Sequence, residues 1–157
     1  MGSSVPAALD YLASTIPTLP AVMDFQPRVA FSDGWPDKRG DVMVVLAGTP
    51  DGSDAQNLTQ SYSMLSGQEH EDVAVVSTIW VRRAGVDMAS RARRDAYSIL
   101  DAINDLIRSD RRLGGAISTG MPARISNIRT LQTSSAKQAG TGRACEVRWT
   151  LTWQHRT

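Results

Sequence analysis

The sequence predicts an α+β domain in which one long helix and a short N-terminal helix pack on one largely antiparallel or mixed β-sheet. Two observations predict this fold. Residues 87–110 repeat apolar side chains at helical spacing, and this is the one long helical pattern of the chain. The segments on either side show the period-two alternation or the β-branched runs of strands. A regular strand–helix alternation, typical of doubly wound parallel sheets, is missing.

The first half of the chain supplies the short helix and several strands. Residues 5–16 place Leu9, Leu12, Ala13 and Ile16 on one helix face, and prolines at 17 and 20 end the helix. Strands are predicted over 28–31, 41–47 and 61–65. The first two are expected to pair antiparallel through the turn-rich loop 32–40, and 48–59 is expected to be a surface loop.

The second half carries the strongest patterns. Strand 73–83 is apolar on both faces, which indicates a central strand or a subunit contact. The long helix is expected to begin at Asp87 as N-cap, with its end marked by Gly114 and Gly115. Strand 123–133 alternates weakly, with Ala123, Ile125, Asn127, Arg129 and Leu131 on one face. Strand 143–155 alternates cleanly and buries Cys145, Val147, Trp149, Leu151 and Trp153.

Length and composition indicate one domain and exclude several classes of protein. The chain has 157 residues, of which 5–157 are expected to form a single domain and 1–4 a frayed end. The net charge of +1 argues against tight duplex binding, which normally uses a strongly basic domain. The apolar runs are far shorter than the ~20 residues of a membrane span. The single cysteine excludes an intrachain disulfide and a cysteine-rich zinc site.

Candidate catalytic groups are scarce. His70 lies in an acidic segment that lacks the second histidine of a zinc helix, and we expect it in a solvated turn. His155 is expected at a frayed C-terminus, and Cys145 in the core as a small apolar side chain. No phosphate-binding loop, nucleophile elbow or calcium loop is present in the sequence. The sequence therefore predicts no enzyme, no cofactor and no metal.

Arginine is the unusual feature, because 17 basic residues include only Lys38 and Lys137 as lysines. Arg82 and Arg83 end the apolar strand, and Arg91, Arg93 and Arg94 follow at the start of the helix, where positive charge opposes the helix dipole. Two alternatives are open: Arg91 pairs with Asp95 four residues on, or the arginines meet an acidic partner or phosphate. Trp80, two residues before Arg82, is expected either in the core or at an interface as an anchor.

Residues 73–115 resemble the tail terminator (neck) proteins of long-tailed bacteriophages. The resemblance lies in Val-x-Val-x-Ser-Thr-Ile-Trp-Val-Arg-Arg from Val73, in Gly85-x-Asp87, in Ile-Leu-Asp-Ala-Ile-Asn-Asp-Leu-Ile from Ile99, and in Arg-Leu-Gly-Gly from Arg112. The alternating last strand, the chain length and the N-terminal helix fit the same pattern. Residues 33–70 depart from it most.

This resemblance implies a structural virion protein of the phage neck, assembled in the host cytoplasm. The chain would form a homo-oligomeric, hexameric ring that caps the tail tube and ends its polymerisation. The ring would present a surface to the head–tail connector (stopper) protein, and genome DNA would pass through its lumen. We expect subunit contacts at Trp80, Arg82, Arg83, Arg91 and Arg94, and partner-facing loop residues at Asp51, Asp54, Lys137 and Arg143. The alternatives are a head-completion protein, a small ligand-binding protein or enzyme, and a nucleic-acid-binding protein using the arginines.

Overall fold

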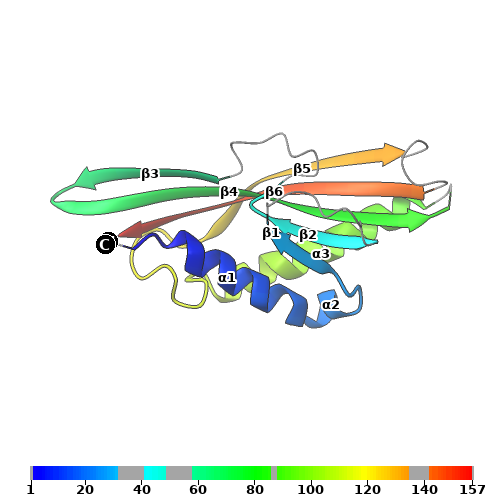
Figure 1. Cartoon of the computed structure of the whole chain (residues 1–157), viewed down its shortest axis with the longest axis horizontal. Helices are drawn as coiled ribbons and strands as arrows, with labels where there is room; N and C mark the ends of the chain where they lie inside the picture. The colour runs from blue at the N-terminus through cyan, green and yellow to red at the C-terminus, as the bar shows by residue number, and fades with distance from the viewer. Residues whose placement is uncertain (1, 32–40, 49–57, 86–87, 135–141, 157) are drawn as a thin grey trace.

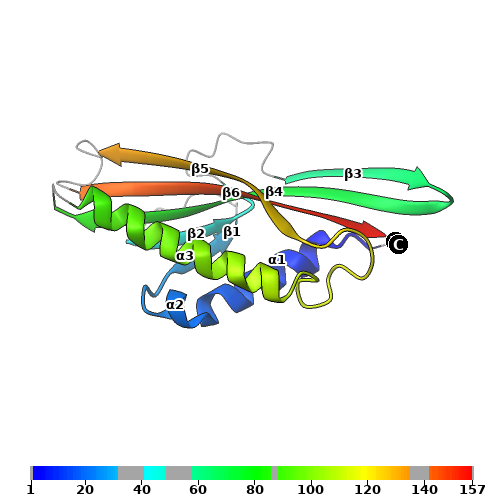
Figure 2. The same ribbon diagram turned by 180° about the vertical axis from the view of Figure 1, so that it is seen from behind.

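A computed structural model describes residues 2–31, 41–48, 58–85, 88–134 and 142–156, and it has the predicted α+β fold. The helical elements are α1 (Val5–Thr15), a 3-10 turn (Ile16–Thr18), α2 (Pro20–Met23) and α3 (Ala89–Ser109). The strands are β1 (Arg28–Phe31), β2 (Val42–Leu46), β3 (Leu58–Leu65), β4 (Gln68–Ala84), β5 (Arg124–Ser134) and β6 (Gly142–Arg156). All helices lie on one face of the sheet, which we call the helix face; the other is the helix-free face (Figures 1 and 2).

The described strands form one mixed sheet in the order β1-β2-β4-β6-β5, and β3 also pairs with β4. β4 and β6 are its long central pair, in antiparallel register from His70–Arg156 to Ala84–Gly142. On its other edge β4 pairs first with β3 and then with β2. The prediction of a central strand here is confirmed.

The prediction that β1 and β2 pair antiparallel is wrong, because they pair in parallel from Arg28–Met43 to Phe31–Leu46. The cluster of turn residues between them indicated a hairpin, yet hairpin loops are usually 2–5 residues long. Ten residues separate Phe31 from Val42, and an extended chain of that length reaches about 33 Å. That reach exceeds the length of either short strand, so the chain can return and enter the sheet in the same direction.

The long helix α3 and the short helix α1 cover the middle of the helix face. The apolar stripe of α3 is buried, and its two small residues Ala92 and Ala96 let the helix approach the sheet closely. α1 buries Ala8, Leu12 and Ile16 against the same core. Asp87, the predicted N-cap, lies outside the described residues, and Met88 holds the N-cap position of α3.

β5 contains an irregularity that the alternation did not reveal. Its register with β6 shifts between Ile125 and Asn127, so Ser126 is an extra residue, as in a β-bulge. Past this point Ile128 and Thr130 share the face of Ile125, whereas Asn127 points to the opposite face. The predicted single face running from Ala123 to Leu131 is therefore wrong beyond Ile125.

Candidate interaction surface

The β3–β4 arm, residues 58–75, projects from the helix-covered part of the sheet (Figures 1 and 2). Ser66 and Gly67 form its two-residue turn, both with positive φ, as two-residue hairpins of type I′ require. Every side chain of β3 is exposed. The strand carries four large apolar side chains with exposed fractions of 39% to 71%: Leu58, Tyr62, Met64 and Leu65.

The middle of the arm is held by a buried carboxylate, that of Glu71 of β4, which lies opposite Tyr62 of β3. Ser3 Oγ donates to Glu71 Oε1 at 2.6 Å, and Ser4 donates to Oε2 from its backbone N at 2.9 Å and its hydroxyl at 2.7 Å. Gln60 Nε2 of β3 also donates to Oε1. Trp153 Nε1 of β6 in turn donates to Ser4 Oγ at 2.8 Å. These bonds connect the N-terminus, β3, β4 and β6.

This arrangement corrects the expected frayed end, since Ser4 is buried and bonded to Glu71. It also sets the charge state of the site. Burial raises the pKa of Glu71, but the hydrogen bonds from Ser3, Ser4 and Gln60 outweigh it and bring the pKa below its usual value. The carboxylate is therefore ionised at neutral pH. The pKa of Tyr62 is raised by desolvation and by the negative charge of Glu71.

The predicted arginine surface is divided between the two faces of the sheet. Arg83 lies on the helix face, where its Nε is 2.7 Å from Asp95 Oδ2 of α3. Arg91, whose side chain is 64% exposed, lies 4.0 Å from the same carboxylate oxygen. Of the two alternatives for Arg91, the pair with Asp95 is thus present, but Arg83 is the closer partner. Arg94 is exposed on α3.

Trp80 and Arg82 belong to the helix-free face, because Trp80 packs with Met43, Val45 and Ala144 in a separate apolar cluster. Trp80 is buried within its own chain. Strand alternation explains the division: consecutive residues of β4 point to opposite faces, so Arg82 and Arg83 cannot share a surface. The five residues predicted for a subunit contact therefore do not form one patch.

Of the predicted partner-facing residues, Asp51, Asp54 and Lys137 lie outside the described residues. Arg143 is described and is half-buried near the start of β6, opposite Arg83 of β4. Its position is thus in the sheet rather than in the preceding loop.

Two expectations for the histidines are wrong, while that for the cysteine is confirmed. His70 is buried inside β4, between Ser63 of β3 and Arg156 of β6, because the strand begins at Gln68. His155 is buried in β6, and its Nδ1 accepts a 3.4 Å hydrogen bond from the Ser118 backbone N–H. Cys145 is buried in the core, and burial raises the pKa of its thiol. A thiol of this kind is inert.

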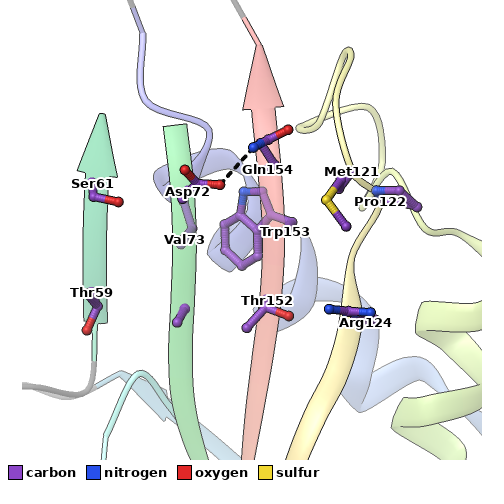
Figure 3. Close-up of a pocket in the computed structure, with 11 residues that line it drawn as sticks. Thr59, Ser61, Asp72, Val73, Met121, Pro122, Arg124, Thr152, Trp153 and Gln154 are labelled. Atoms are coloured by element: carbon purple, nitrogen blue, oxygen red, sulfur yellow. Dashed lines mark hydrogen bonds between the residues drawn. The ribbon is translucent and has the colours of Figure 1, made fainter. Parts of the chain in front are cut away.

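A shallow hollow of about 300 Å³ lies on the helix-free face (Figure 3). It crosses β3, β4 and β6 to the start of β5, and Gln154 Nε2 donates to Asp72 Oδ1 across it at 2.9 Å. Its charged lining residues are Asp72 and Arg124. Histidine and cysteine are absent from its lining, so it holds no nucleophile–base pair of the kinds that use them.

The described residues contain no group of three or more histidine, cysteine, aspartate or glutamate side chains placed to hold a metal ion. Among the described helices, none is both long enough and apolar enough to span a bilayer.

Comparisons with known proteins give a likeness in structure. No family model and no curated protein matches the chain. The structure is similar to a chain from the virion of a native gene transfer agent particle, with a TM-score of 0.47 and 10% sequence identity. The likeness covers 94% of this chain and 91% of the other.

The β3–β4 arm is the feature that the sequence analysis missed. The sequence predicts a short strand over 61–65, a strand from Val73 and, between them, an acidic turn around His70, and it does not join the two strands into one hairpin. The signal that could have found it is Ser66-Gly67, a two-residue turn flanked by the uncharged run Leu58–Leu65.

Proposed function

We propose that this chain is a structural subunit of a phage tail that assembles as a ring, caps the tail tube and joins it to the head–tail connector. The observation that carries the proposal is the β3–β4 arm. Natural proteins protect exposed edge strands with charges, prolines or bulges, because a bare apolar edge promotes association. β3 has none of these along its eight residues. Such a strand suits a subunit that is completed by its neighbours.

The choice of a tail terminator among structural subunits rests on the sequence resemblance over residues 73–115. The helix-free face fits that role. Along β6 it presents Glu146, Arg148, Thr150, Thr152 and Gln154, a polar row in which Arg148 Nε lies 2.6 Å from Glu146 Oε1. We place this face toward the lumen of the ring. The pairing of Arg148 with Glu146 would reduce the attraction of this row for DNA phosphates.

Within this proposal the subunit contacts the tail tube protein and the connector as well as its own copies. Of the five arginine and tryptophan residues first predicted for subunit contact, Arg91 and Arg94 have exposed side chains. They are the members of that set that we retain for contacts between proteins.

The test is electron microscopy of the purified protein, scored for annular particles, followed by addition to polymerising tail-tube protein. We expect rings, and tubes that stop growing once capped. A strict monomer at micromolar concentration, both alone and with tail-tube protein, would overturn the proposal. Binding to filled heads and not to isolated tails would instead assign the chain to head completion.

A further inference from the structure

We propose that copies of this chain join edge to edge, with the outer edge of β3 of one copy pairing with the outer edge of β5 of the next. The inference rests on the proposed function in taking the chain to be a ring subunit, and it names the two surfaces that close the ring. An interface built from two different surfaces can repeat head to tail, and it closes when the rotation per subunit allows it.

The β3 edge is open along its whole length. In the described part of the chain β3 pairs only with β4, so one row of its backbone N–H and C=O groups has no strand partner. Its sequence, Leu-Thr-Gln-Ser-Tyr-Ser-Met-Leu, contains no charge and no proline. Its register with β4 is continuous over all eight residues, without a bulge. These are the conditions under which an edge accepts another strand.

The β5 edge is the other long free edge. Among the described strands β5 pairs only with β6. Its bulge at Ser126 interrupts the start of the strand, but the register is regular from Asn127 to Ser134. This regular stretch of eight residues equals β3 in length.

The side chains on the helix face of the two edges are complementary. On β3, Tyr62 and Met64 point to the helix face and are more than half exposed. On the β5 side, Ile128 points to the same face and is 47% exposed, and the exposed Tyr97 of α3 is hydrogen-bonded to Thr130, two residues further along that face. Pairing β3 with β5 of a neighbour places these apolar groups together and removes them from water.

Charge favours β3 joining β5 over β3 joining a second β3. The arm carries Glu69, Glu71 and Asp72 with no lysine or arginine, whereas β5 carries Arg124 and Arg129 with no acid. These acids lie on β4, one strand in from the edge, so two arms side by side would place two acidic strands on either side of the paired β3 strands, and like charges repel. An arm beside β5 brings opposite charges together.

The two edges also lie at different heights along the strands. Through β4, β3 lies level with residues 151–156 of β6, whereas the regular part of β5 lies beside residues 143–150. Pairing between neighbours therefore continues the sheet with a stagger. A sheet needs such a stagger, and the strand tilt that follows from it, in order to close on itself.

The first test places a charge on each edge and measures self-association by light scattering and analytical ultracentrifugation. Met64→Lys on β3 and Ile128→Lys on β5 should each weaken association about tenfold or more. The matched control is Met23→Lys, since Met23 of α2 is 56% exposed and lies on neither edge. All these positions are exposed, so circular dichroism should show folded variants. An equal effect from the control, or none from the edge variants, overturns the inference.

The second test detects the contact itself through disulfide formation. Cys145 is buried and does not compete with introduced thiols. One batch of protein carries a cysteine on β3, Ser61→Cys or Ser63→Cys. It is mixed with a second batch that carries a cysteine on β5, Asn127→Cys or Arg129→Cys. All four positions point to the helix-free face and are exposed. We expect cross-linked dimers in at least one mixture and in no single batch. Dimers from a β3 batch alone would show β3–β3 pairing and overturn the inference.

These results separate the inference from the proposed function. Rings that persist in both lysine variants and give no β3–β5 disulfide would overturn the edge pairing and leave the terminator role standing. Edge-paired rings that neither bind nor cap tail tubes would overturn the terminator role and leave the pairing standing.

Discussion

The two halves of β4 share one strand and have opposite surroundings. From Val76 to Val81 the strand pairs with β6 on one edge and, from Thr78, with β2 on the other, and its apolar helix-face side chains are buried in the main core. From Gln68 to Asp72 it pairs with β3, a strand whose side chains are all exposed, and from His70 onward it also pairs with the end of β6. Both halves are hydrogen-bonded into the sheet, yet all side chains of β3 beside the second half remain exposed. Strand pairing alone therefore does not bury the side chains of a sheet; packing beneath the helices does.

The largest expected effect compares two leucines. Leu151 of β6 is fully buried in the covered half, and Leu65 at the tip of the arm is 57% exposed. We expect Leu151→Ala to lower the free energy of unfolding by about 2–5 kcal/mol, through lost apolar burial and the cavity left behind. Leu65→Ala should change it by about 0.5 kcal/mol or less. Urea unfolding measures both, and similar losses would contradict the division of the sheet.

Two glycines compare a closely packed backbone position with an open one. Gly120 has φ +110, and a Cβ there would lie 2.2 Å from the carbonyl oxygen of Gln154 in β6. Gly67 in the arm turn has φ +78, and a Cβ would meet nothing within 4 Å. We expect Gly120→Ala to cost about 3 kcal/mol, from strain plus a backbone clash. Gly67→Ala should cost only the conformational strain, about 1 kcal/mol. Thermal unfolding of the two variants checks the order.

The connection between arm and core depends on Glu71, and its effect depends on pH. Glu71→Gln replaces one acceptor oxygen with an NH₂ group facing the donors of Ser3, Ser4 and Gln60. We expect a loss of about 1–3 kcal/mol at pH 7. The folded pKa of Glu71 lies below the usual 4.5, so its stabilisation is complete above that pH and is lost as pH falls through the folded pKa.

The difference between wild type and Glu71→Gln should therefore shrink below pH 4.5. Urea unfolding at pH 7 and in acid measures it. Glu69→Gln, two residues earlier on the same face of β4, is the control, for which we expect a change within about 0.5 kcal/mol at pH 7. A loss for Glu71→Gln that does not vary with pH would show that the carboxylate charge is not the cause.

The sequence predicted the elements whose patterns are local. The stripe of α3 and the alternation of β6, from Cys145 to Trp153, are set by what each segment buries, and both were found with nearly correct bounds. The direction of β1 was not predictable from turn residues, because the ten residues between Phe31 and Val42 are enough for either a parallel or an antiparallel connection. The bulge at Ser126 reversed the faces of β5 for a similar reason: register is a property of two strands, not one.

The candidate site was less predictable for a physical reason. The sequence shows that the arginines are clustered, but not which surface each one reaches. Arg82 and Arg83 point to opposite faces because they are consecutive in β4, and the surface that Arg91 and Arg94 reach depends on where α3 packs. Glu71 lies in an acidic run that indicated exposure to solvent, and two of its donor residues, Ser4 and Ser3, lie 67 and 68 residues away in the chain. A buried carboxylate stabilised by distant donors leaves no pattern in the segment that contains it.

The smallest expected effect separates two arginines that share Asp95. Arg83 is 22% exposed, lies 2.7 Å from the carboxylate, and has its guanidinium 6.0 Å from the centre of the Phe25 ring. Arg91 is 64% exposed at 4.0 Å. We expect Arg83→Gln to cost about 1 kcal/mol and Arg91→Gln about 0.3 kcal/mol, because water screens the exposed pair. A double-mutant cycle with Asp95→Asn measures each coupling. If Arg91→Gln leaves stability unchanged and weakens self-association, Arg91 acts between subunits. Equal coupling energies of the two arginines with Asp95 would contradict the assignment of Arg83 to the fold and of Arg91 to the surface.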